Sequence, residues 1–135
     1  NMVDLADATG MVWDQEGLLS GVEERESLFS TAMPCGAALL HPPHHEPYMF
    51  EDSFIVLGRC LQPIFFGAPG GAKTGIFFLI CSQDDRIHLH LLARVSMICR
   101  ETSILEDLYT TESAGDMYDL LLTAEQEMIH RHSPV

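Results

Sequence analysis

The chain has 135 residues, 47% of them hydrophobic, and a formal net charge of −13. This length predicts a single domain, residues 1–135, with enough apolar side chains for a hydrophobic core. The acidic balance argues against nucleic acid as a partner, because its phosphates would be repelled by such a surface. Two interpretations stay open: a docking surface for a basic protein, or a solvated acidic surface that keeps the chain in solution.

The cysteines and the apolar runs indicate in which cellular compartment the protein is located. Cys35, Cys60, Cys81 and Cys99 form no CxxC pair and three of them lie in apolar runs, which predicts reduced, buried thiols rather than disulfides or a zinc site. No apolar run reaches membrane-spanning length and no signal peptide is recognisable, so we expect a cytoplasmic protein without membrane insertion. Residues 3–6 already look like the middle of a helix, which suggests a domain cut from a longer protein.

The N-terminal third predicts two helices and a strand. Residues 3–10 resemble the tail of a helix, and Asp14 can cap a second helix that runs to about Glu26. The stretch Ser30–His41 contains a turn and then a short apolar run, which is typical of a buried strand. Pro42 and Pro43 cannot continue a sheet ladder, so the strand should end near His41 and place an imidazole at its end.

The middle of the chain is rich in β-branched and aromatic residues, and its end is helical. The nearly all-apolar run 75–82 is typical of a central strand covered on both faces. The glycine-rich turn 67–73 lacks the spacing of a nucleotide-binding loop. These patterns predict an α/β fold with a mixed sheet and helices on both faces. The predicted strands are Ser53–Leu61, Ile64–Phe66 and Gly75–Ser82, and the predicted helices are Asp84–Arg100, Ser103–Tyr109 and Ser113–His130.

Seven histidines are many for this length, and most have an ordinary explanation. His130 and His132 lie in the polar C-terminal region, where we expect them to be exposed and without function. His44, His45 and Glu46 could be imagined as metal ligands, but the prolines before them favour an extended loop that splays neighbouring side chains. A metal site needs three or four convergent ligands, so none is predicted here.

Two histidines are better candidates for chemistry. His41 ends the predicted strand, and His88 lies in the first turn of the helix after the most apolar strand. The N-terminal end of a helix favours a nearby anion, and a neutral imidazole is a competent nucleophile near pH 7. Phosphoryl transfer depends mainly on positioning and charge neutralisation, which two histidines and an arginine around one phosphate would supply.

The motifs resemble a known family. The segment Arg25–His41 (RESLFSTAMPCGAALLH) is similar, without a gap, to the Arg-Glu, Ser-Thr, glycine-turn and histidine motif of enzyme IIA domains of the bacterial phosphoenolpyruvate:sugar phosphotransferase system. The matching branch is the fructose/mannitol and nitrogen-regulatory (PtsN-like) type. Pro63–Ala68 (PIFFGA), Ile76–Ile80 and His88–Arg94 (HLHLLAR) resemble its later segments. Here Leu40 stands where the family usually has proline, and Pro42-Pro43 stiffen the loop that follows.

The resemblance implies a phosphocarrier built on a mixed sheet of about five strands. His41 matches the histidine that accepts a phosphoryl group from the carrier HPr or a paralogue, and His88 matches the supporting histidine. Arg25 matches the arginine that offsets phosphate charge, and Thr31 matches a hydroxyl that lines the site. No cofactor is implied, and a IIB domain or a regulatory protein is the further partner.

A second hypothesis remains open. The chain could be a regulatory or sensing module that keeps the enzyme IIA fold without transferring phosphate. It would then belong to a larger protein, possibly a DNA-binding one. Labelling by HPr would favour the first hypothesis, whereas binding of another partner without labelling would favour the second.

Overall fold

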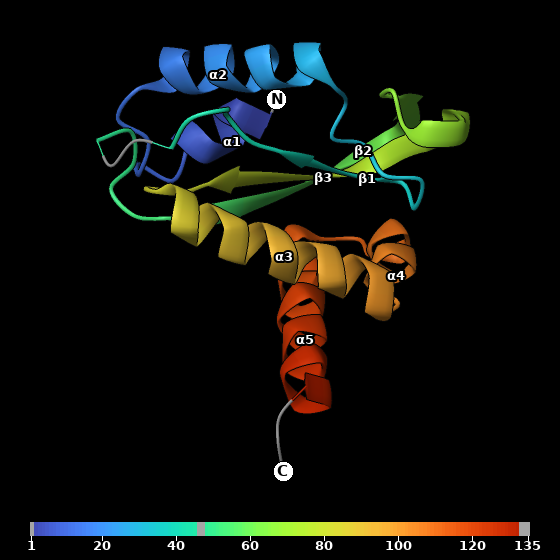
Figure 1. Ribbon diagram of the computed structural model, residues 1–135. Coiled ribbons are helices and arrows are strands. Elements are labelled where there is room, and N and C mark those ends of the chain that lie inside the picture. Colours follow the sequence, from blue (N-terminus) through green and yellow to red (C-terminus); the bar gives the residue numbers. More distant parts are fainter. Residues whose placement is uncertain (1, 46–47, 133–135) are drawn as a thin grey trace.

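A small sheet lies between two layers of helices (Figure 1). The computed structural model describes residues 2–45 and 48–132. Helices α1 (Met2–Asp7) and α2 (Gln15–Leu28) cover one face of the sheet. Helices α3 (Asp85–Glu101), α4 (Ile104–Thr110) and α5 (Ala114–His132) lie on the other side. This arrangement confirms the predicted α/β class with helices on both faces.

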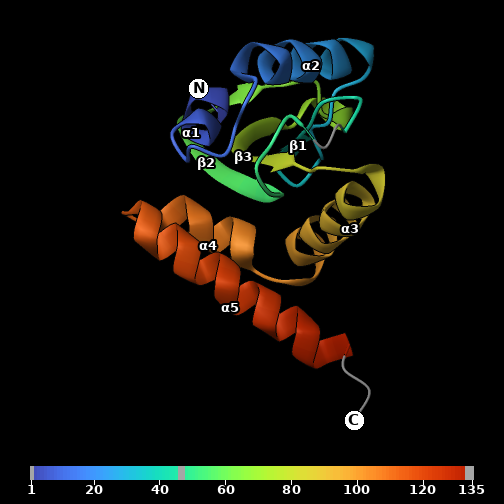
Figure 2. The ribbon, with the colours of Figure 1, turned by 90° about the vertical axis from the view of Figure 1, so that its left-hand side faces the viewer.

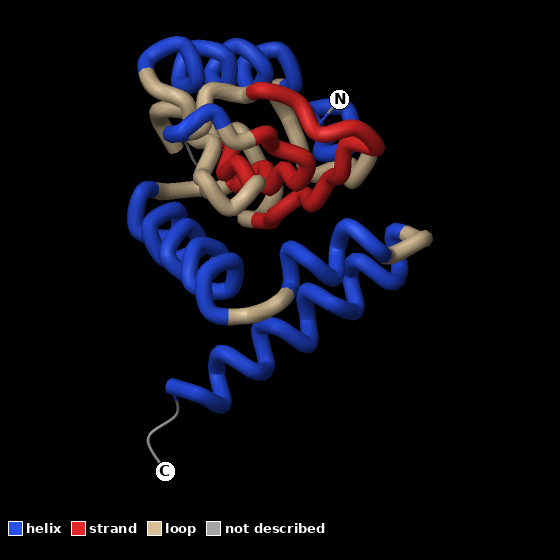
Figure 3. Tube along the Cα trace, turned by 90° about the vertical axis from the view of Figure 1, so that its right-hand side faces the viewer, coloured by secondary structure: helices blue, strands red, loops and turns tan. Residues whose placement is uncertain are grey.

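The sheet has the order β1-β3-β2 in the described residues, with β1 (Ala37–Leu40) parallel and β2 (Phe54–Phe65) antiparallel to β3 (Lys73–Cys81). Every residue of β3 after Lys73 is buried, which confirms the prediction of a central strand covered on both faces. Figure 3 shows the strands enclosed between helices.

The number of strands differs from the expectation of about five. Within residues 2–45 and 48–132 there are three strands, and two further pairings, Val12 with Phe50 and Ala32 with Ala38, are only isolated bridges. The first bridge cannot extend because Gly10, at a φ of 76°, ends the turn after α1 and Asp14 already caps α2. Too few residues remain between the two helices for a ladder.

A second difference concerns the strand predicted over 64–66. It is not separate: β2 continues through it to Phe65, with a register shift between Arg59 and Ile64. Such an irregularity lets one strand bend and keep its partner. The glycine-rich segment that follows forms the expected turn, with a short 3-10 helix η1 (Pro69–Gly71).

Helices α2 and α3 both begin where carboxylates can cap them. The Asp14 side chain accepts a hydrogen bond from the Gly17 N–H at 2.9 Å, and the Asp84 side chain accepts one from the Ile87 N–H at 2.8 Å. These caps satisfy N–H groups that the helix itself leaves free. Both helix starts were predicted, while α2 ends at Leu28, slightly beyond the expected Glu26.

The core is divided by the sheet, because successive residues of β3 point to opposite faces. Phe77 and Leu79 pack toward α1 and α2, whereas Phe78 and Ile80 pack toward α3, α4 and α5. Figure 2 shows α4 and α5 side by side in the second layer. The inward face of α5 includes Ala124, which is buried against this second cluster.

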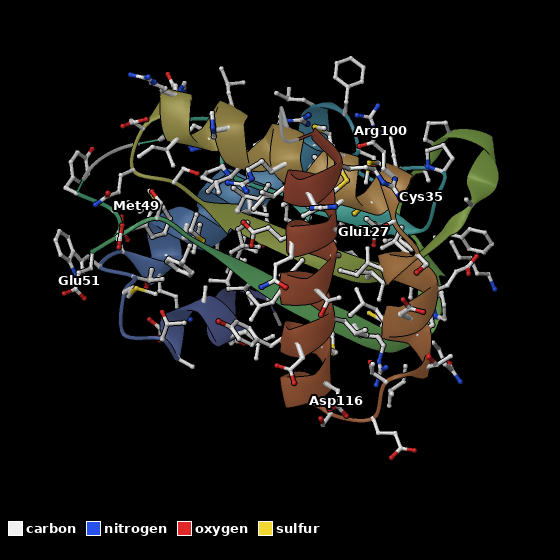
Figure 4. All side chains as sticks on the ribbon, turned by 90° about the horizontal axis from the view of Figure 1, so that it is seen from below. Cys35, Met49, Glu51, Arg100, Asp116 and Glu127 are labelled. Carbon is white, nitrogen blue, oxygen red and sulfur yellow. The ribbon has the colours of Figure 1, made fainter. Side chains whose placement is uncertain are left out.

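The cysteines follow the prediction only in part. All four are free, and Cys81 and Cys99 are buried, but Cys60 is half-buried and Cys35 is exposed. Cys35 is exposed because it lies in the turn before β1 rather than in an apolar run. Figure 4 shows Cys35 and Arg100 at one end of the molecule and Met49 and Glu51 at the other. The loop that follows β1 is therefore at the end of the sheet opposite to Cys35.

Candidate functional site

His41 stands directly after β1, as predicted, and its ring is oriented by the backbone. Its Nδ1 lies 2.9 Å from the carbonyl oxygen of Leu39. Because a carbonyl oxygen can only accept, Nδ1 must carry the proton in this contact. The Nε2 atom then holds the free lone pair. In its neutral form the half-buried His41 therefore carries its lone pair on Nε2, where it can act as a nucleophile.

His88 lies against His41 although 47 positions separate them in the sequence. The two ring centroids are 4.6 Å apart, at an interplanar angle of 44°. His88 is only 6% exposed, and its Nδ1 is buried without a hydrogen-bond partner among the described residues. The convergence of the two imidazoles, on which the predicted site depends, is therefore present in the structure.

His45 joins the same cluster, which the sequence analysis did not foresee. Its ring stacks on His88 with centroids 4.0 Å apart and an interplanar angle of 22°, and lies 6.4 Å from the His41 ring. The prolines had suggested an extended loop, but the chain bends at Pro43 and His44, and this bend turns His45 back toward the site. His44 is exposed, and His45 is half-buried against the site.

The C-terminal turn of α2 brings two charges near His41. Arg25 donates from its guanidinium to the carbonyl oxygen of Phe29 at 2.6 Å. Glu26, which was not predicted as a site residue, accepts hydrogen bonds from the Thr31 hydroxyl and, at 3.1 Å, from the Thr31 N–H. Thr31 is therefore bound directly to Glu26. Both charges influence His41: Arg25 lowers its pKa and Glu26 raises it.

Burial keeps the imidazoles neutral. Burial, assisted by the neighbouring His45 and His41 and opposed by Asp85, lowers the pKa of His88 to about 4. Burial also lowers the pKa of His41 and of His45. All three pKa values therefore lie below 7, so the three imidazole rings are mainly neutral at pH 7.

Other candidate residues do not join this cluster. No group of three histidine, cysteine or acidic side chains within 2–45 and 48–132 could hold a metal ion. Glu46, considered above as a ligand, lies outside the described residues. His130 is exposed, as expected. No helix in the described part of the chain is long and apolar enough to cross a membrane.

A strand-end imidazole with a free Nε2, beside a second buried imidazole, is the geometry expected of a phosphohistidine site. Residues 1–124 match the family described as "Phosphoenolpyruvate-dependent sugar phosphotransferase system, EIIA 2". The chain belongs to this family. Membership of this family supports a phosphocarrier role in the sugar phosphotransferase system.

Relatives and solved structures agree with this assignment. The chain is 25% identical over 122 residues to the fructose-specific EIIABC component of Bacillus subtilis; the match covers 89% of the chain but only 19% of that protein. The chain thus spans about a fifth of the length of this curated relative.

Three solved structures share the fold. IIA mannitol of Escherichia coli superposes with a TM-score of 0.75 at 18% identity, covering 89% of this chain and 83% of that one. The Escherichia coli complex of enzyme IIA mannitol with phosphorylated enzyme IIB mannitol gives 0.76 at 16% identity, covering 90% and 83%. The nitrogen regulatory protein IIA-Ntr of Neisseria meningitidis gives 0.61 at 23% identity, covering 76% and 69%.

Proposed function

We propose that this domain carries a phosphoryl group on Nε2 of His41, received from a phosphohistidine of an HPr-type carrier. The observation that supports this most directly is the hydrogen bond between His41 Nδ1 and the Leu39 carbonyl oxygen. It holds the proton on Nδ1 and leaves the Nε2 lone pair free for attack on phosphorus. The ring is held at the end of β1, so little motion is needed before transfer.

The transfer is a displacement at phosphorus. The Nε2 lone pair of His41 forms the new N–P bond, and the electron pair of the broken N–P bond returns to the donor's imidazole. The Nδ1 proton stays on its hydrogen bond with Leu39. Transfer in the opposite sense passes the group to the next acceptor, and neither step requires a metal ion or an organic cofactor.

The neighbouring side chains have distinct roles in this proposal. His88, 4.6 Å from His41 between ring centroids, supplies an N–H to the phosphoryl oxygens. The unpartnered, buried Nδ1 of His88 supports this role, because a buried polar atom normally has a hydrogen-bond partner. Arg25 offsets the negative charge, and Thr31 fixes the position of Glu26.

The proposed transfer requires a phosphoryl donor and a phosphoryl acceptor. The net charge of −13 favours a donor that docks with a basic face. The Escherichia coli IIA mannitol domain was solved with phosphorylated IIB, and a IIB domain is by analogy the acceptor proposed here. The cytoplasm is the compartment where such carriers would meet the domain.

Labelling from phosphoenolpyruvate through enzyme I and HPr tests the proposal. We expect one acid-labile phosphate per chain, lost in His41→Ala and retained in His44→Ala, which alters an exposed histidine three positions away. Equal labelling of His41→Ala and the unaltered chain would show that another residue is the acceptor.

A regulatory role is the second candidate. The similarity in fold to a solved nitrogen regulatory IIA protein favours it, as does the stiff Pro42-Pro43 segment, which precedes the His45 ring stacked on His88. In that case HPr would fail to label the domain, while another partner would still bind it.

A further inference from the structure

Two buried imidazole nitrogens at the site have no partner in the described residues. They are Nδ1 of His45 and Nδ1 of His88, on rings stacked 4.0 Å apart. A buried nitrogen without a hydrogen-bond partner costs free energy, on the order of 1–3 kcal/mol. Neither ring donates to the other through these atoms. Together they indicate a hydrogen-bonding group that the site receives from outside.

The loop that presents His45 is anchored rather than loose. Pro42 is buried and packs against α2 at Gly21, where an added Cβ would lie 2.9 Å from the Pro42 Cβ. This close approach requires a residue without a side chain. Because Pro42 and Pro43 restrict the backbone, the anchor at Gly21 fixes where the loop turns inward. The packing of Pro42 on Gly21 therefore holds the loop in the position that stacks His45 on His88.

We propose that His45 and His88 form a stacked imidazole pair that binds the phosphoryl group carried by His41 and takes up one proton as that group arrives. The inference rests on the proposed function and adds a third histidine to its site. The proton comes from solvent and is returned to it when the phosphoryl group leaves. In this account His45 is part of the phosphoryl-binding site and shares the added proton with His88.

The charged groups around the pair decide when it is protonated. Asp84 and Asp85 at the start of α3 favour a charged His45, whereas His41 and His44 oppose it. On the other side, Arg25 and Glu26 face His41 with opposite signs. In the free domain, burial outweighs the carboxylates and lowers the pKa of both His45 and His88. A phosphoryl group adds about two negative charges, which favour the protonated form of both rings and so oppose the effect of burial.

The direction of the pH dependence follows. Because the phosphorylated domain binds one more proton than the free domain, falling pH shifts the transfer equilibrium toward phosphorylation. For uptake of one full proton, the equilibrium constant changes by about tenfold per pH unit. Without a protonatable ring at position 45, the equilibrium constant of phosphoryl transfer should depend less on pH.

The first test compares His45→Gln, His45→Phe and the control His44→Gln. The ratio of phosphorylated to free domain at equilibrium with HPr is measured between pH 6 and 8, always with the same HPr, so that its own titration cancels. The slope of the logarithm of this ratio against pH should fall by at least half in both His45 variants. It should stay unchanged in His44→Gln. His45→Phe retains a flat ring for stacking, so a loss there is a loss of the titrating group. Unchanged slopes in both His45 variants overturn the inference.

The second test does not need the carrier. NMR titration of the imidazole resonances, with and without inorganic phosphate, should show His45 and His88 titrating at higher pH when phosphate is present. If His45 does not respond to phosphate, the inference is wrong even if labelling of His41 succeeds. If phosphate raises the pKa of both rings while HPr fails to label His41, the His45–His88 pair is an anion-binding site and the proposed transfer is wrong.

Discussion

The ring of His45 lies 4.0 Å from that of His88, nearly parallel to it, and covers a histidine that is itself 6% exposed. This contact places the loop after β1 on the first turn of α3 (Figure 1). The two rings and His41 form one cluster from two segments distant in sequence. A change in charge at any of the three is therefore felt by the others at short range.

Replacing His88 should slow phosphoryl transfer without preventing it. In His88→Ala the phosphoryl oxygens lose a hydrogen-bond donor in a site shielded from water, and we expect the transfer rate to fall about 100-fold. His88→Gln retains an N–H and should recover part of this loss. Rapid-quench labelling by phosphorylated HPr gives the rates, and circular dichroism checks that the variants are folded. Equal rates in all three proteins would assign His88 a purely structural role.

The buried His88 also predicts that stability depends on pH. Its pKa is lowered to about 4 in the folded chain, below the ordinary value of 6.5, so the unfolded chain binds more protons between these two values. The free energy of unfolding should therefore decrease as the pH falls from about 6.5 toward 4. One such group contributes a slope of up to about 1.4 kcal/mol per pH unit.

Urea unfolding between pH 5 and 7 measures this slope. Carboxylates contribute to it as well, so the informative quantity is the difference between the unaltered chain and His88→Phe, which cannot bind a proton. We expect the variant to have the shallower slope. A slope identical in both proteins would mean that His88 binds its proton equally well in the folded and unfolded chains.

The sequence alone predicted those elements whose signals are local. Asp14 and Asp84 marked both helix starts because a capping carboxylate acts on N–H groups within one turn. The apolar run of β3 indicated a central strand because burial on both faces leaves no polar positions. The pairing of His41 with His88 was implied by the family resemblance, since no periodic pattern connects two residues so far apart.

What could not be predicted depends on tertiary contacts. The inward position of His45 follows from the packing of Pro42 on Gly21, two residues that nothing in the sequence links. The bond between Glu26 and Thr31 likewise depends on how the chain turns after α2. Single bridges replaced full strands because caps and turns on either side limit how far a ladder extends. The family was thus easier to predict from the sequence than the tertiary contacts that position the residues around His41.

Glu26 should oppose phosphorylation of His41. Its carboxylate raises the pKa of His41 and, by the same field, repels an incoming phosphoryl group. Glu26→Gln keeps a side chain that can accept from the Thr31 N–H and removes the charge. We expect the equilibrium with HPr to shift toward the phosphorylated domain by about tenfold or less.

Glu23→Gln is the matched control for this change, because it removes an exposed carboxylate of the same helix, one turn away. It should shift the equilibrium less, since solvent screens exposed charges. Equal shifts in both variants would attribute the effect to the overall charge of the domain rather than to Glu26.

Gly21→Ala should move the loop that carries His45. In most exposed helical positions this substitution stabilises a protein by roughly 0.5–1 kcal/mol, because alanine restricts the unfolded chain. At Gly21 the new Cβ would meet Pro42 at 2.9 Å, and we expect a net destabilisation of about 1–3 kcal/mol from overpacking. Gly115→Ala is the control, because the atom nearest to a Cβ there is 3.9 Å away. Urea unfolding gives both values, and imidazole NMR should show changed His45 and His88 resonances in Gly21→Ala alone. If Gly21→Ala stabilises the chain as much as Gly115→Ala does, Pro42 does not anchor the loop, and the position of His45 must have another cause.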